Sequence, residues 1–319
     1  MDDWCVLGVD LGSTTAKAVV VGSDGRMLSS AVVQMGAVSR KGVEVAIDRA
    51  LADAGIARDR IVRTISTGYG RKLVPGADRT FTEITCHARG AVALAPGVRL
   101  VIDIGGQDSK AIAIGTDGLV DRFAINDRCA SGTGRFFDVL SRALEVEVTD
   151  VADLALASNR DVEVSGMCAT FAETEVISLL AQGEEPSDIA ASVHRSVAGR
   201  TLGLVAQVGK AAPVVMTGGV AQNHAFVAEL ARMLGLEVTV LDDPQIAGAL
   251  GAALIARDDH LGALAEGAHL ADSAAEASWD TAKAAPAPHC ADCDGHPEFH
   301  ATGPVHIELA LARPGRADR

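Results

Sequence analysis

The stretch VDLGSTTAKAVVVGSDG, residues 9 to 25, occurs a second time in the chain as IDIGGQDSKAIAIGTDG, residues 102 to 118. The copies align without a gap at an offset of 93 positions and share an Asp, two Gly, a Lys, an Ala and the final Asp-Gly. In each copy an apolar run rich in Val and Ile predicts a strand that is buried on both faces. A turn of small residues, a second strand, an Asp-Gly hairpin signal and a third strand follow, so each copy predicts a β-meander.

The first turn of each meander has the composition of a phosphate site. Residues 12–15 and 105–108 combine small side chains and hydroxyls with the carboxylate that ends the preceding strand. Clustered backbone N–H groups suit phosphate, and a carboxylate suits a hydrated Mg²⁺. A single copy is more simply explained as a strand-ending turn, but repetition at a fixed offset favours two facing loops that clamp one polyphosphate.

The composition limits the class of protein. A chain of 319 residues with 48% hydrophobic content is long enough for about two domains, each with its own core. A formal net charge of −14 argues against nucleic acid and anionic membranes as partners, and 3% aromatic residues disfavour base-stacking surfaces. The acidic start MDDWCVLGVD and the lack of an 18-residue apolar run predict a cytoplasmic protein with reduced cysteines.

Helices and strands alternate after each meander, which predicts an α/β fold. In the first part a helix is expected over 42–56, a strand over 61–67 and a helix over 82–95. In the second part the expected helices cover these ranges: 133–146, 150–158, 169–182, 187–209, 220–235 and 244–257. Strands are expected over 213–219 and 236–242. From about residue 262 the composition changes to Ala, Ser, Glu, Pro and His, so the expected parts are 1–97, 98–261 and a flexible tail, 262–319.

The two Asp-x-Gly loops and the late Met216-Thr217-Gly218-Gly219-Val220 turn resemble the actin, hexokinase and Hsp70 superfamily. The resemblance implies two duplicated actin-like (ribonuclease H-like) domains that face each other across a nucleotide cleft. It also implies that the turn at Gly218 and Gly219 approaches the adenosine.

Three further segments are similar to one branch of that superfamily. They are DIGGQDSK (103–110), NDRCASGTGRFFDVL (126–140) and CATFAETEVISLLAQG (168–183). Over roughly residues 5 to 258 the chain resembles the ATPase components of 2-hydroxyacyl-CoA dehydratase activators and of ATP-dependent benzoyl-CoA reductases.

Cys129 and Cys168 stand out among the six cysteines, because each is predicted to lie at the N-terminus of a helix, where thiolates are stabilised. They are 39 residues apart with no third cysteine nearby, whereas a four-iron cubane takes four thiolates. A twofold dimer would supply four, and the resemblance implies one 4Fe-4S cluster per dimer. The alternative is that both are ordinary buried cysteines, as is expected for Cys5 and Cys86.

The resemblance also implies roles for residues of the loops. Asp10 and Asp103 are expected to hold Mg²⁺ and its waters, and Gln107 to orient the attacking water. The residues expected to contact ATP are Gly12, Ser13, Thr14, Thr15, Lys17, Gly105, Gly106, Lys110, Gly218 and Gly219. For both lysines the alternative is a solvated residue on an edge strand.

By resemblance the protein is a dimer, with itself or with a related subunit, that accepts an electron from reduced ferredoxin or flavodoxin. ATP hydrolysis then drives this electron at low potential into a CoA-thioester reductase or dehydratase. The extended C-terminus favours a benzoyl-CoA reductase subunit over a dehydratase activator. A sugar or small-metabolite kinase and a non-catalytic nucleotide-gated scaffold are alternatives of other classes.

The tail segment HCADCDGHPEFH allows two interpretations. Cys290, Cys293, His296 and His300 could form a zinc knuckle, but only two residues separate the Cys pair from the first His. A flexible His-rich tail fits the composition better.

Overall fold

The computed structural model describes residues 4–35, 38–164 and 169–265 of the chain. The chain divides into two units, residues 1–269 and 270–319, and the elements below all belong to the first. Cys168 and the four Cys and His residues of the tail lie outside the described residues. None of the helices described is long and apolar enough to cross a membrane.

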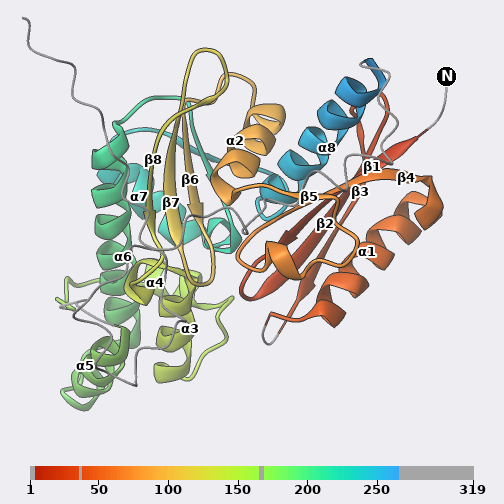
Figure 1. Cartoon of the computed structure of the whole chain (residues 1–319). Helices are drawn as coiled ribbons and strands as arrows, with labels where there is room; N and C mark the ends of the chain where they lie inside the picture. Colours follow the sequence, from red (N-terminus) through yellow and green to blue (C-terminus); the bar gives the residue numbers. More distant parts are fainter. Residues whose placement is uncertain (1–3, 36–37, 165–168, 266–319) are drawn as a thin grey trace, which may run out of the picture. The chain divides into compact units, whose positions relative to one another are not determined.

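The fold contains two five-stranded sheets with the same internal order (Figure 1). The first has the order β3-β2-β1-β4-β5. The second, written from its corresponding edge, has the order β8-β7-β6-β9-β10, so that β6 takes the place of β1. The strands of the first sheet are β1 (Cys5–Leu11), β2 (Thr15–Gly22), β3 (Met27–Gln34), β4 (Ile61–Thr67) and β5 (Arg79–Thr80). Those of the second are β6 (Leu100–Ile104), β7 (Ser109–Ile114), β8 (Val120–Asn126), β9 (Val214–Thr217) and β10 (Val238–Val240).

The duplication seen in the sequence extends to details of strand pairing. Both predicted meanders are present and antiparallel, and the first strand of each also pairs in parallel with a later strand, β4 or β9. The register of the second hairpin shifts between Val20 and Val21 in one copy and between Ala113 and Ile114 in the other, again 93 positions apart. The two sheets are therefore copies of one β-unit.

The helices follow the predicted alternation. They are α1 (Arg40–Ala54), α2 (Glu83–Leu94), α3 (Gly134–Ala143), α4 (Val151–Leu156), α5 (Ala169–Ala181), α6 (Pro186–Val208), α7 (His224–Leu234) and α8 (Ala247–Ala265). Short 3₁₀ turns are η1 (Arg58–Arg60), η2 (Arg71–Leu73), η3 (Ala130–Gly132) and η4 (Gly219–Gln222). The helix predicted over 220–235 is divided, because the Asn223 side chain accepts a hydrogen bond from the Phe226 N–H and caps α7 there.

Each sheet is covered by helices on both faces. On the first sheet α1 packs against one face, and α8 packs against β1, β2 and β4 on the other. The sequence analysis placed α8 in the second part of the chain, 98–261, but its apolar residues belong to the core of the first sheet. The cores of the second sheet take in α2 on one side and α3 to α7 on the other.

Candidate functional site

A cavity of about 420 Å³ lies where the first turns of the two meanders meet. The thirteen residues that the sequence analysis assigned to ATP, Mg²⁺ or the attacking water all line it: Asp10, Gly12, Ser13, Thr14, Thr15, Lys17, Asp103, Gly105, Gly106, Gln107, Lys110, Gly218 and Gly219. The structure thus brings both copies of the repeated motif to one place, although their roles there remain predictions.

The two turns have the same backbone geometry. The Gly12 N–H donates to the Thr15 carbonyl at 3.0 Å, and the Gly105 N–H donates to the Asp108 carbonyl at 3.0 Å. A Cβ on Gly106 would lie 2.9 Å from the Thr14 side chain, so the two turns also approach each other directly. Two turns of small residues that meet at one cavity suit a chain of phosphates.

An Asp–Lys ion pair lies at the base of each meander. Asp10 and Lys17 are register partners on β1 and β2, and their side chains are 3.1 Å apart. Asp103 and Lys110 are register partners on β6 and β7, also 3.1 Å apart. The alternative of solvated edge lysines is wrong, because β2 and β7 are interior strands and Lys110 is 2% exposed.

Lys110 has more than one carboxylate partner. Its Nζ lies 2.8 Å from Asp108 Oδ1 and 3.0 Å from Glu83 Oε2, in addition to Asp103. Burial alone would lower the pKa of Lys110, but the carboxylates of Asp103, Asp108 and Glu83 outweigh it and raise that pKa. Lys110 therefore stays charged at the bottom of the cavity.

Asp103 is held in its ionised form. Burial would raise its pKa, but nearby His87 and Lys110 and a hydrogen bond from Thr217 Oγ1 at 2.9 Å together hold the pKa of Asp103 below its usual range. The His87 ring nitrogen Nδ1 is 3.4 Å from Asp103 Oδ1. The Asp103 carboxylate is therefore ionised at neutral pH, while its role toward Mg²⁺ stays a prediction.

A glycine follows the parallel neighbour of each Asp-bearing strand and faces the carboxylate. Gly68, with φ +92°, follows β4, and a Cβ there would lie 2.3 Å from Asp10 Oδ1. Gly218, with φ +85°, follows β9, and a Cβ there would lie 2.9 Å from Asp103 Oδ1. Both positions require glycine for conformation and for space.

Four residues that contact Asp103 or Lys110 were not singled out from the sequence: Glu83, His87, Asp108 and Thr217. Glu83 and His87 are four positions apart on α2, so both side chains lie on the helix face that meets the second sheet. Thr217 occupies the last position of β9, beside Asp103. For the ion pairs Asp10–Lys17 and Asp103–Lys110, the sequence did contain a signal, because the Asp and the Lys are seven residues apart in both copies of the repeat.

Asp108 provides a pH-dependent test of this charge cluster. Burial first, with repulsion by Asp103 and Glu83, raises the pKa of Asp108 from 3.8 to about 6 even though Lys110 lowers it. A raised carboxylate pKa penalises the folded state increasingly as pH rises from about 4 to above 6. In nucleotide-free Asp108→Asn protein this pH-dependent loss of stability is absent, because the asparagine side chain does not ionise.

We therefore expect Asp108→Asn to unfold at a higher temperature than wild type at pH 8, by the equivalent of about 1 to 3 kcal/mol. At pH 4.5 the difference should fall to about a third of this value, because most of the penalty develops between pH 4.5 and pH 6. Thermal unfolding followed by circular dichroism at both pH values measures this, and a difference that is the same at both would contradict the assignment.

A second hollow of about 390 Å³ continues from the cavity and shares Thr14, Thr15, Gly105, Gly106, Gly219 and Gln245 with it. Its further lining includes the apolar side chains of Phe137, Val148, Ala152 and Val220. A hollow with apolar walls next to a polar phosphate site suits a nucleoside. Gly219 lines both spaces, and the approach of the Gly-Gly turn to the adenosine stays a prediction.

Cys129 is not at the N-terminus of α3 as predicted, but is the N-cap of the one-turn η3, and α3 begins at Gly134. Asn126 holds it: the Asn126 Oδ1 accepts from the Cys129 N–H at 3.1 Å, and Nδ2 donates to the Cys129 carbonyl at 2.8 Å. Its Sγ is half-buried and 2.9 Å from the Ser131 hydroxyl. A thiol that is held and partly accessible fits a cluster ligand, and its predicted partner Cys168 lies outside the described residues.

Within residues 4–35, 38–164 and 169–265, no group of three or more His, Cys, Asp and Glu side chains is arranged to hold a metal ion. A cluster assembled from two subunits would not produce such a group in one chain. A Mg²⁺ held mainly through waters and phosphates would not require one either.

The segment that follows Cys129 is hydrogen-bonded to the first turn of the second meander. The Gly134 N–H donates to the Gly105 carbonyl at 2.8 Å, and the Arg135 N–H donates to the Gly106 carbonyl at 2.9 Å. The Thr133 hydroxyl donates to the same Gly106 carbonyl at 3.1 Å. A displacement of the turn would therefore be transmitted to the cysteine segment.

The sequence of the chain was compared with protein families and with individual known proteins. Residues 7–256 match the BadF/BadG/BcrA/BcrD ATPase family. The chain is 43% identical over 251 residues to the (R)-2-hydroxyglutaryl-CoA dehydratase activating ATPase of Acidaminococcus fermentans, which covers 78% of this chain and 96% of that relative. It is 40% identical over 253 residues to the 2-hydroxyisocaproyl-CoA dehydratase activator of Clostridioides difficile, covering 79% and 95%.

The solved structure of the activator of the 2-hydroxyisocaproyl-CoA dehydratase from Clostridium difficile with bound ADPNP matches with a TM-score of 0.78 and 39% identity, covering 82% of this chain and 97% of that chain. These matches confirm the predicted actin-like fold.

A benzoyl-CoA reductase component of Thauera aromatica is 30% identical over 257 residues, covering 77% of this chain and 91% of that relative. The sequence analysis favoured a benzoyl-CoA reductase subunit, but the higher identities support the alternative, a dehydratase activator.

Proposed function

The chain belongs to the BadF/BadG/BcrA/BcrD ATPase family, and on that premise we propose that it hydrolyses ATP to drive a low-potential electron into a 2-hydroxyacyl-CoA dehydratase. One observation carries the proposal. The turn that would bind phosphates is hydrogen-bonded to the segment that follows Cys129, so nucleotide state and the surroundings of this thiol are physically connected.

We assign the hydrolytic roles as follows. Asp10 and Asp103 accept hydrogen bonds from the waters of Mg²⁺, while Lys17 and Lys110 balance their charge and that of the phosphates. The backbone N–H groups of the two turns bind the phosphate oxygens, and the Gln107 side chain orients the attacking water.

We further propose that Cys129 and Cys168 from two copies of the chain hold one 4Fe-4S cluster. A bound cluster supplies a site that takes up and releases one electron. Asn126 fixes the backbone of Cys129, and the Ser131 hydroxyl is placed to donate a hydrogen bond to the sulfur. Hydrogen bonds to sulfur and exposure to solvent set the reduction potential, so a shift transmitted through residues 133–135 would alter it.

The electron donor in this scheme is reduced ferredoxin or flavodoxin, and the acceptor is the dehydratase itself. Anaerobic protein with Mg-ATP should release ADP without any sugar present. In the presence of reductant it should switch on a recombinant 2-hydroxyacyl-CoA dehydratase component in an ATP-dependent manner. ADP release that requires a sugar and yields its phosphate would overturn the proposal in favour of a kinase.

A further inference from the structure

The cavity at the two meander turns is also lined by Arg71, a residue that the sequence analysis did not single out. Arg71 ends the loop Gly68-Tyr69-Gly70-Arg71, which follows β4, and it begins the 3₁₀ turn η2. Lys72, the next residue of this turn, is exposed and does not belong to the lining of the cavity. The two neighbouring cations therefore differ in their access to a bound nucleotide.

Hydrogen bonds fix the backbone of Arg71 and of the loop before it. The Arg71 N–H donates to the Gly68 carbonyl at 3.2 Å, and the Arg71 carbonyl accepts from the buried Ser66 hydroxyl at 2.9 Å. The Gly70 N–H donates to the carbonyl of Leu11, the last residue of β1, at 2.8 Å. The loop that carries Arg71 is thus bonded to the strand end from which the first meander turn starts.

The side chain of Arg71 is directed back toward the end of β4. Its Nη1 donates to the Gly68 carbonyl at 3.2 Å. Gly68 faces the Asp10 carboxylate, because a Cβ at this glycine would collide with Asp10 Oδ1. A guanidinium carries several N–H donors, and this bond occupies one of them. The head group therefore lies near the carboxylate assigned to Mg²⁺, with further donors for a ligand.

The charge of Arg71 differs from that of the two lysines in the cavity. Lys17 lies 3.1 Å from Asp10, and Lys110 contacts three carboxylates. Among the residues that the structure describes, Arg71 forms a hydrogen bond with a carbonyl and no ion pair with a carboxylate. A polyphosphate that binds among carboxylates requires positive charge that is not already balanced. Arg71 provides such a charge.

Arg71 belongs to the part of the cavity that the nucleoside hollow does not share. The two spaces have residues of both meander turns in common, and Arg71 lines the cavity but not the hollow. A nucleotide with its nucleoside in the hollow would pass its phosphates between the turns into the cavity. Arg71 would then meet the phosphate that is furthest from the nucleoside.

We propose that Arg71 is a further catalytic residue whose guanidinium binds the terminal phosphate of ATP, a role that rests on the ATP hydrolysis proposed above. In hydrolysis a water oxygen forms a bond to the terminal phosphorus, and the bond from this phosphorus to the bridging oxygen breaks. ADP leaves with the electron pair, and a proton of the water passes to solvent. A planar cation with parallel N–H donors matches two phosphate oxygens and stabilises their charge in the transition state.

The test compares Arg71→Ala with the matched control Lys72→Ala. In Arg71→Ala, steady-state ADP release should fall about a hundredfold or more, as when one positioned donor is removed from a transition state. Affinity for the non-hydrolysable analogue ADPNP with Mg²⁺ should fall about tenfold or more. Affinity for ADP should stay unchanged, because ADP lacks the phosphate that Arg71 binds. Lys72→Ala removes an equal charge from the same turn and should match wild type in all three measurements.

Arg71→Lys separates charge from geometry. It keeps the positive charge but loses the planar fork, so it should recover most of the ADPNP affinity and leave turnover at least about tenfold below wild type. If Arg71→Ala does not fold, Arg71→Lys and Lys72→Ala decide the question together.

Wild-type protein that releases no ADP from Mg-ATP would overturn the proposed function, and the role of Arg71 with it. Turnover in the wild type that is unchanged in Arg71→Ala and Arg71→Lys would overturn the role of Arg71 alone. Equal losses of affinity for ADP and ADPNP in Arg71→Ala would show that Arg71 only supports the loop, and would overturn its contact with the terminal phosphate.

Discussion

Asp103→Asn protein is expected to hydrolyse ATP about a hundred to a thousand times more slowly than wild type, because a preorganised charge at the metal site is lost. The substitution preserves shape, since the asparagine oxygen can still accept the hydrogen bond from Thr217. Lys110 keeps Asp108 and Glu83 as partners, so the fold should be retained. The loss should appear in kcat, with the melting temperature little changed.

Asp10→Asn should give a loss of similar size, because the duplicated meander places Asp10 and Lys17 as it places Asp103 and Lys110. Steady-state ADP release measures both variants. Asp121→Asn, an exposed carboxylate on β8, is the matched control and should have wild-type turnover. If either buried variant kept wild-type turnover, the two turns would not form one hydrolytic site.

Cys129→Ser should reduce the iron content to near zero instead of to half. In a shared cluster the twofold axis applies every substitution twice, so one change removes two of the four thiolates. ATP binding should survive, because the cavity is lined by the two meander turns and not by Cys129. Iron per dimer after anaerobic reconstitution, together with nucleotide affinity, measures both effects.

Cys5→Ala provides the control, since Cys5 lies buried in β1, within the core of the first sheet. It should bind iron as wild type does. A Cys129→Ser protein that held four irons per dimer would remove Cys129 from the site. If the iron content per dimer fell only by half, each subunit would hold a separate iron site.

The duplication explains why so much could be predicted from the sequence. A stretch of 17 residues that recurs without a gap at an offset of 93 positions predicted both meanders with their first turns, and the similarity of the two turns then implied that they face each other. Their arrangement is determined locally, because the residues between Asp10 and Lys17 form a single hairpin. All the predicted ligands of ATP consequently line one cavity.

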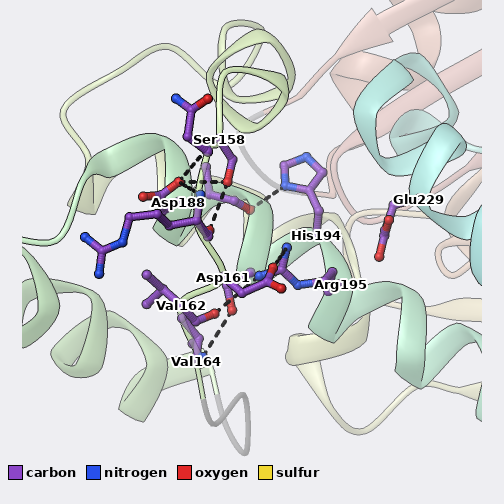
Figure 2. Close-up of polar contacts among 12 residues, drawn as sticks. Ser158, Asp161, Val162, Val164, Asp188, His194, Arg195 and Glu229 are labelled. Atoms are coloured by element: carbon purple, nitrogen blue, oxygen red, sulfur yellow. Dashed lines mark hydrogen bonds and ion pairs between the residues drawn. The ribbon is translucent and has the colours of Figure 1, made fainter.

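The contacts that were not predicted join segments far apart in the chain. Glu83 and His87 reach Lys110 and Asp103 from a helix whose apolar spacing gave no sign of a polar role. The packing of α8 on the first sheet requires the chain to return after both sheets are complete. The Asp188 carboxylate accepts hydrogen bonds from the Asn159 and Arg160 N–H groups, which lie 29 and 28 residues earlier in the chain (Figure 2). No local spacing in the sequence indicates this contact.

Cys129 shows a different limit. The sequence analysis expected Cys129 to lie at the N-terminus of the helix over 133–146, but the 3₁₀ turn η3 lies between Cys129 and α3, and the Thr133 hydroxyl donates to the Ala130 and Gly106 carbonyls at this junction. Ser and Thr side chains commonly compete with helical bonding in this way. The thiol is placed by that interruption and by Asn126, instead of by a regular helix end.

The proposed cluster is tested most directly by the iron and acid-labile sulfide content of anaerobically purified wild-type protein, measured with its native mass and visible spectrum. We expect a brown dimer that contains four irons and four sulfides per two chains and releases them together on chelation. A colourless protein without iron, or a monomer that carries a complete cluster of its own, would contradict the shared cluster and the electron-transfer role that depends on it.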